Sequence, residues 1–101
     1  MARIQIANLT GTTQQVTATV NYITYANGKQ IIKITHVNIN NIQINHCWLY
    51  QQSFNKPFKF YKSSISRQIQ FTATIDTYYK IRDNKKVLDY CLNKVDNIKF
   101  I

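Results

Sequence analysis

The chain has 101 residues and carries 13 lysines and arginines against 4 acidic residues, which gives a formal net charge of +9. This length predicts one domain (1–101) with a modest core. The absence of any apolar run of about eighteen residues or of an N-terminal apolar region excludes a membrane span and a secretory signal. Cys47 and Cys91 are too few for a disulfide framework and lack metal-site spacing. We therefore expect reduced thiols, a cytoplasmic location, and no metal or cofactor.

The first two predicted strands form a hairpin. Residues 14–25 alternate in a way that is typical of a half-buried strand. Asn27-Gly28 then supplies the strongest short hairpin signal, because a type I′ turn needs positive φ at both positions. Residues 30–39 form the returning strand. Unbroken alternation in the first strand places Val16, Ala18, Val20 and Tyr22 on one face and Thr17, Thr19, Asn21 and Ile23 on the other.

The third predicted strand, 42–50, follows a turn at residues 40–41 and leaves two orientations open. A regular strand places Trp48 in the core, on one face with Ile42, Ile44, His46 and Tyr50. A bulge near Asn45 instead sends Cys47 and Leu49 inward and frees His46, Trp48 and Tyr50 for a ligand.

Residues 51–66 show no period of two, so we expect an irregular or short helical insertion there. Within it, the segment 54–62 (FNKPFKFYK) has four aromatic rings and three lysines. Pro57 prevents this segment from being a central strand. We expect Phe58 and Phe60 to point inward. Phe54 and Tyr61 are expected at the surface, where Lys56, Lys59 and Lys62 widen the positive field.

The clearest strand pattern is 67–81, with Ile69, Phe71, Ala73 and Ile75 on one face. A polar loop at 82–86 and one or two short closing strands in 87–101 follow. A meander of three strands, an insertion and two further strands predict an all-β, five-stranded, OB-fold-like barrel. An SH3-like barrel or a small sandwich fits the pattern nearly as well.

Charge is the most informative global feature of the sequence. The four acids are Asp76, Asp83, Asp89 and Asp96, so residues 1–75 contain no carboxylate. The cations of that stretch must therefore form a positive surface field, which attracts polyanions such as nucleic acid. A basic protein without such a partner is the alternative. These cations are Arg3, Lys29, Lys33, Lys56, Lys59, Lys62 and Arg67.

The chain has few carboxylates and histidines that could serve in catalysis, so we expect no enzyme and no catalytic residues. Four scattered aspartates do not suit a two-metal nuclease, which needs convergent acids. No nucleotide-binding, hydrolase or zinc-protease motif is present. A metal-independent ribonuclease that uses His36 or His46 stays as a third hypothesis.

Binding of single strands needs a cationic groove and exposed rings on which bases stack. An OB-fold presents its ligand site on strands two and three, between the first hairpin loop and the loop joining strands four and five. Rings and cations collect at these positions and in the neighbouring insertion. The predicted nucleic-acid-binding residues are Tyr25, Lys29, Lys33, Trp48, Tyr50, Phe54, Lys56, Tyr78, Lys80, Arg82, Lys85 and Lys86.

Three segments also resemble a known family. NHCWLY, RQIQFTATIDTYYK and LDYCLNKVDNIKF are similar to the small OB-fold single-stranded DNA-binding proteins of staphylococcal cassette chromosome elements and related phages of Gram-positive bacteria. The departures are Asn45 for aspartate, Cys47 for leucine, and Ser66-Arg67 for Gly-Asp, which puts the turn geometry in question. The matching positions are His46, Trp48, Phe71, Ala73, Tyr79 and Leu88-Asp89-Tyr90.

The resemblance implies an OB-fold and single-strand binding in the replication of a phage or mobile genetic element. RNA as a ligand and a homo-oligomeric state stay open. Because the sequence ends in NIKFI without acidic residues, we expect no partner recruitment through an acidic tail. The alternative function is a protein-interaction module, such as a phage inhibitor of a host factor. Its weakness is that inhibitors that mimic DNA are usually acidic.

Overall fold

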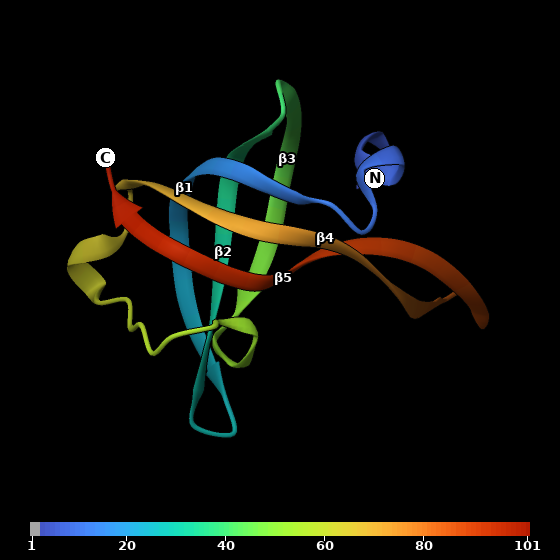
Figure 1. Cartoon of the computed structure of the whole chain (residues 1–101). Coiled ribbons are helices and arrows are strands. Elements are labelled where there is room, and N and C mark those ends of the chain that lie inside the picture. The colour runs from blue at the N-terminus through green and yellow to red at the C-terminus, as the bar shows by residue number, and fades with distance from the viewer. Residues whose placement is uncertain (1–2) are drawn as a thin grey trace.

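The computed structural model describes residues 3–101, with side chains from Ile6 onward, and consists mainly of β-strands (Figure 1). The predicted all-β, five-stranded class is confirmed to this extent: the five strands form one antiparallel sheet, in the order β3-β2-β1-β4-β5. The strands are β1 (Thr13–Ala26), β2 (Lys29–Ile39), β3 (Ile42–Tyr50), β4 (Gln68–Arg82) and β5 (Lys85–Phe100). Short 3-10 helices are η1 (Arg3–Leu9), η2 (Gln51–Ser53) and η3 (Lys62–Ser64). Within the described residues, no helix is long and apolar enough to cross a membrane.

The closing segment differs from its prediction. It is one strand of 16 residues, β5. Where the sequence predicted a loop at 82–86, the structure has a turn of two residues, Asp83 and Asn84. Both turn residues have positive φ, 53° and 62°, the combination that a type I′ hairpin requires. The β4–β5 hairpin therefore extends beyond the rest of the sheet as a two-stranded arm (Figure 1).

The sheet curls but is not closed by a ladder between its edge strands, β3 and β5. An isolated parallel bridge joins Phe54, just after η2, to Val95 of β5. The helix η1 contacts both β3 and β5 and contributes Ile6, which is fully buried, to the core. The seam between the two edges is thus covered in part by η1. The sequence did not indicate this helix.

Bulges bend the strands around the core. Between two regular pairs of the β1–β2 ladder, Ala18 opposes both His36 and Val37, and His36 has a φ of 51°. In the β4–β5 ladder, Phe71 opposes Asn97 and Ile98 in the same way. An extra residue in one strand increases twist and bends that strand. β5 carries a second bulge, at Lys94 opposite Ala73, so its inward positions Leu92, Val95 and Ile98 fall on every third residue.

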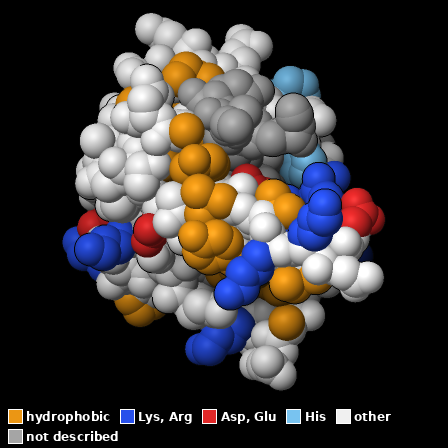
Figure 2. All heavy atoms as spheres, turned by 90° about the vertical axis from the view of Figure 1, so that its right-hand side faces the viewer, with side chains coloured by type: hydrophobic (Ala, Val, Ile, Leu, Met, Phe, Trp, Pro, Cys, Tyr) orange, Lys and Arg blue, Asp and Glu red, His pale blue; other side chains and the backbone are white. Residues whose placement is uncertain are grey.

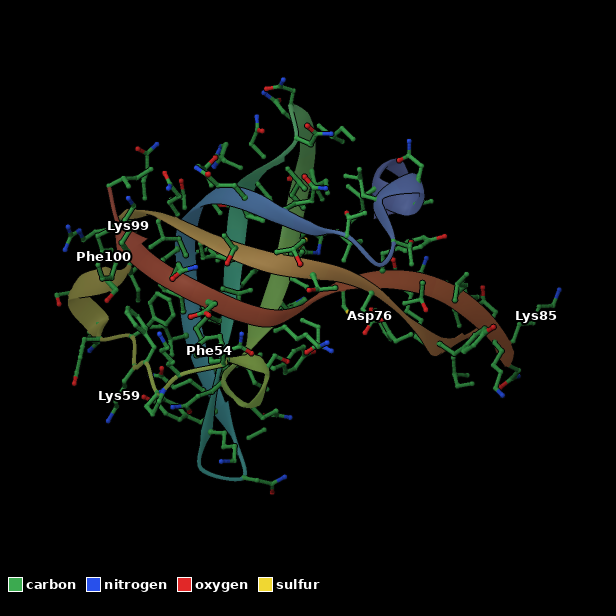
Figure 3. The ribbon with its side chains drawn as sticks, viewed as in Figure 1. Phe54, Lys59, Asp76, Lys85, Lys99 and Phe100 are labelled. Atoms are coloured by element: carbon green, nitrogen blue, oxygen red, sulfur yellow. The ribbon has the colours of Figure 1, made fainter. Side chains whose placement is uncertain are left out.

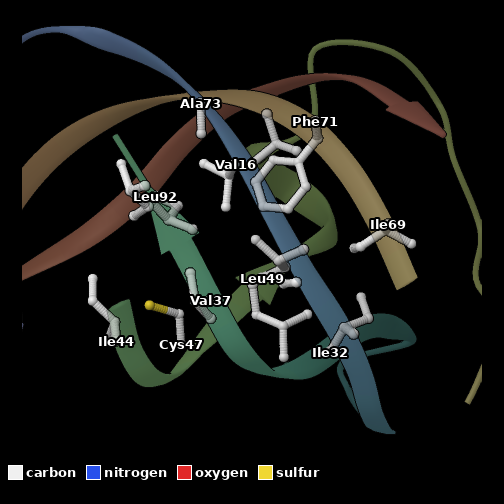
Figure 4. Packing of buried hydrophobic residues seen from close by; sticks show 14 of the residues in the cluster. Val16, Ile32, Val37, Ile44, Cys47, Leu49, Ile69, Phe71, Ala73 and Leu92 are labelled. Atoms are coloured by element: carbon white, nitrogen blue, oxygen red, sulfur yellow. The ribbon is translucent and has the colours of Figure 1, made fainter. Parts of the chain in front are cut away.

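The core is built from the inward faces of all five strands (Figure 4). Ile69, Phe71, Ala73 and Ile75 are all buried, as the β4 pattern predicted. On β3 the buried residues are Ile44, Cys47 and Leu49. The inward phase therefore changes between Ile44 and Cys47, so Cys47 and Leu49 point inward and Trp48 is left out of the core, as the second alternative predicted. The β2–β3 register has no extra residue at Asn45, however, and the irregularity is the positive φ of His36 on β2.

The insertion between β3 and β4 is tied down by a buried glutamine. Gln30 is 1% exposed, and its side-chain amide donates to the Phe60 carbonyl at 2.7 Å. The Phe60 N–H in turn donates to the Gln30 Oε1 at 2.8 Å. Phe60 is buried and packs against Phe58, with ring centroids 4.9 Å apart. Phe58 and Phe60 thus point inward, as predicted.

Candidate nucleic-acid interface

A row of three side chains crosses the outer face of the sheet on β1, β2 and β3. Tyr22 is paired with Lys33, and Lys33 is paired with Trp48. Their neighbours Ile32, Ile34, Cys47 and Leu49 are buried, so the row lies on the face opposite the core. The rings of Tyr22 and Trp48 meet edge-to-face with centroids 5.8 Å apart. The row thus combines one lysine with two aromatic rings that contact each other on the outer face of the sheet.

Tyr22 was assigned to the wrong face by the sequence pattern. The β1–β2 ladder has an extra residue, Asn21, between the pairs Val20–Ile34 and Tyr22–Lys33. This bulge turns Tyr22 outward, where it is 43% exposed, and turns Ile23 toward the core. The signal for it was the polar Asn21 inside an otherwise apolar and β-branched run.

The row continues toward the first hairpin turn. Tyr50, 40% exposed, is paired with Ile31 of β2, on the same face as Trp48. Lys29 begins β2 on that face. No acidic residue occurs anywhere in β1, β2 or β3. Of the predicted site residues, the structure therefore brings together Lys29, Lys33, Trp48 and Tyr50.

Tyr25 does not join this group. It is paired with the buried Gln30 and therefore belongs to the inward-facing set of β1, although at the hairpin end it is 58% exposed. Its hydroxyl accepts a hydrogen bond from the Gln30 amide at 3.1 Å. This contact gives Tyr25 a structural role at the end of the core.

A cleft lies beside the row, along the seam between β3 and β5. It measures about 340 Å³ and is lined by Trp48 and Tyr50 of β3 and by Tyr78 of β4. The remaining lining residues come from η2 and β5: Cys47, Gln52, Ser53, Tyr90, Cys91, Leu92 and Asn93. Trp48 belongs both to the row and to the cleft wall, so the two form one continuous surface.

The predicted cations of the fourth and fifth strands lie on the β4–β5 arm, and Lys85 marks its tip (Figure 3). Lys80 donates to the Asp89 carboxylate at 2.6 Å, and the Tyr78 hydroxyl lies 3.4 Å from the same oxygen. Asp89 thus offsets the charge of Lys80. Arg82, Lys85 and Lys86 are exposed, and the Lys86 ammonium lies 5.6 Å from the centre of the Tyr79 ring.

Phe54 and Lys56 lie apart from the row. Phe54 was expected at the surface, but it is half-buried and packs against the core, with its ring 6.4 Å from that of Phe60. Its bridge to Val95 holds it there, which corrects its expected position at the surface. Lys56 is exposed beside Asp96. Tyr61 is 61% exposed, as predicted.

Asp96 is the one acid near the insertion and is held in its charged form. The backbone N–H of Asn97 donates to it and lowers its pKa below the ordinary value of 3.8. The side-chain amide of Asn55 lowers this pKa further, burial raises it in part, and the charge of Lys56 lowers it by the smallest amount. Asp96 therefore stays negative and partly offsets Lys56.

The arm also exposes an apolar strip that the sequence did not indicate. Ile81 is 70% exposed, Tyr79 66% and Leu88 44%. Tyr79 is paired with Leu88, so these two side chains are neighbours across the ribbon. Figure 2 views the molecule from the side toward which the arm points. It shows apolar side chains along the middle of this face, with lysines and arginines beside them.

Metal-binding and catalytic groups are sparse in the described part of the chain. Among residues 3–101, no three His, Cys, Asp or Glu side chains are grouped in a way that could hold a metal ion. His36 is exposed in the β2 bulge, and His46 lies on β3 opposite Thr35.

Comparisons with known proteins give no match. No family model, no curated protein and no solved structure matches this chain.

Proposed function

We propose that this chain binds single-stranded DNA with little sequence preference, in the cytoplasm, during replication of a phage or mobile genetic element. In this proposal the curled sheet is an OB-fold-like barrel. Support comes from the five-stranded antiparallel sheet with an insertion between β3 and β4. The OB-fold is itself a five-stranded, partly open barrel, and the Phe54–Val95 bridge lies between the two free edges.

The observation that carries the proposal is the row Tyr22–Lys33–Trp48 on a sheet face without acids. Bases of a single strand stack on exposed rings, while phosphates are attracted by cations between and around these rings. Stacking is insensitive to sequence, because every base has a π-face. The positive net charge of +9 adds long-range attraction.

Competition binding tests this proposal. A fluorescent oligo-dT strand is bound and then displaced by unlabelled single-stranded DNA, duplex DNA or single-stranded RNA. We expect single-stranded DNA to compete at least tenfold better than the duplex, because paired bases cannot stack on the row. Equal competition by the duplex would contradict the proposal. Competition by single-stranded RNA measures the preference between deoxyribose and ribose strands.

A second candidate function is favoured by the apolar strip at Tyr79, Ile81 and Leu88. Exposed apolar residues that cluster on an element beyond the core are typical of a protein-binding surface. Affinity purification separates this candidate from the first. A stoichiometric protein partner must survive nuclease treatment and be lost when Ile81→Ser is introduced.

The proposal assigns no catalytic step to the chain. The ribonuclease hypothesis depends on His36 and His46 and predicts RNA cleavage that disappears in His36→Ala or His46→Ala. Cleavage that persists in both variants would contradict a role for these histidines.

A further inference from the structure

The cleft between β3 and β5 has a chemistry that differs from the rest of the positive surface. Rings from three different strands line it, namely Trp48 and Tyr50, Tyr78, and Tyr90. None of the described residues that line the cleft is charged. The Lys80 ammonium lies close to Tyr78, but Asp89 binds it. Phosphate therefore finds no unpaired cation in the lining.

Flat rings with a few amides and hydroxyls are instead suited to a nucleobase. A base presents two π-faces for stacking and a rim of donors and acceptors for hydrogen bonds. Gln52 and Ser53, which line the cleft, supply an amide and a hydroxyl. The amide of Asn93 is already engaged, since its nitrogen donates to Asp76 and its oxygen accepts from the Lys94 N–H. Among the lining amides and aliphatic hydroxyls, those of Gln52 and Ser53 are thus the ones that we assign to the base rim.

The position of the cleft also fits a bound strand. Trp48 contacts Tyr22 on the outer face and lines the cleft as well. A strand that stacks one base on the row can therefore place a neighbouring base in the cleft without leaving the surface.

We propose that the cleft seats one unpaired nucleobase of the bound strand, against the rings of Trp48, Tyr78 and Tyr90. This inference rests on the proposed single-strand binding and adds a base subsite to it. A base in a duplex is excluded, because it must first leave its stack and its partner. The same subsite gives Gln52 and Ser53 a means of favouring some bases at one position of the strand.

Cys91 provides the test, because it lines the cleft and is half-buried, whereas Cys47 is only 2% exposed. The rate of alkylation of Cys91 by N-ethylmaleimide is measured in the free protein, in the protein with oligo-dT, and in the protein with an abasic oligomer of equal length. Fluorescence anisotropy confirms beforehand that each oligomer saturates the protein at the concentration used. The Cys91→Ser variant identifies the signal that belongs to this thiol.

We expect oligo-dT to slow the alkylation about tenfold or more and the abasic oligomer to leave it nearly unchanged. In the reverse experiment, protein alkylated at Cys91 loses about tenfold in affinity for oligo-dT, the order of one stacked base, and keeps its affinity for the abasic oligomer. Saturating oligo-dT without protection of Cys91, or equal protection by both oligomers, would overturn the subsite but leave single-strand binding intact. Failure of oligo-dT to bind at all would overturn both.

Discussion

The ring of Tyr22 stands edge-on to the ring of Trp48, with centroids 5.8 Å apart and an angle of 89° between the planes. Lys33 is paired with both residues across the ladder. Tyr22 on β1 and Trp48 on β3 thus flank β2, and their rings contact each other across it. Each has an accessible surface that a base can cover.

Changing Tyr22→Ala removes one ring of the row and is expected to weaken single-strand binding by about 1–3 kcal/mol, the range found for a stacked base. Tyr61→Ala is the matched control, because Tyr61 is also accessible, at 61% against 43% for Tyr22, but lies in the insertion. Affinity is measured by anisotropy, and thermal unfolding confirms that both variants fold. An equal loss in the two variants would show that the row has no special role.

Changing Lys33→Gln removes the cation of the row. If its ammonium binds a phosphate, the slope of log K against log salt falls by about 0.7 for a single strand. Lys59→Gln is the control, since Lys59 is exposed in the insertion and lies 5.7 Å from the Tyr61 ring. We expect a smaller change of slope for Lys59→Gln. An unchanged slope of log K against log salt in Lys33→Gln would show that Lys33 does not bind a phosphate.

Changing Gln30→Ala leaves the backbone N–H and carbonyl of Phe60 without their buried partners. Unsatisfied buried groups cost roughly 1–3 kcal/mol each, so we expect the free energy of unfolding to fall by about 2 kcal/mol or more. Urea unfolding measures this. Gln43→Ala, at an exposed position of β3, is expected to change stability by less than about 0.5 kcal/mol.

The pKa of Asp96 links stability to pH in a defined direction. Hydrogen bonds from Asn97 and Asn55 lower this pKa in the folded state. The resulting stabilisation is present above the ordinary value of 3.8 and is lost as the pH falls through the folded pKa. Carbon-13 NMR of the carboxyl group measures the titration directly. In Asn55→Ala the midpoint should move up toward the ordinary value, and an unmoved midpoint would contradict the assigned cause.

The sequence predicted the strands well because alternation and turn chemistry are local signals. Asn27-Gly28 correctly predicted the turn of the first hairpin, and the alternation of residues in β4 correctly predicted which face of that strand is buried. Both features depend only on residues that are neighbours in the chain.

Bulges explain most of what the sequence could not predict. An extra residue such as Asn21 reverses the facing of every later residue in its strand, and this is how Tyr22 was missed. On β5, bulges with positive φ at Lys94 and Asn97 interrupt the alternation of inward and outward residues, so the sequence of this strand shows no period of two. The half-buried position of Phe54 against the core depends on its contact with Val95, which is distant in the chain and left no local signal.

Titration of the protein with oligo-dT at two salt concentrations, followed by the fluorescence of Trp48, tests single-strand binding most directly. Trp48 is the only tryptophan of the chain, so its signal reports on the row and the cleft alone. The account predicts a saturable change of fluorescence at low salt and a markedly weaker affinity at high salt. No change at low salt, in a protein that is shown to be folded, would contradict it.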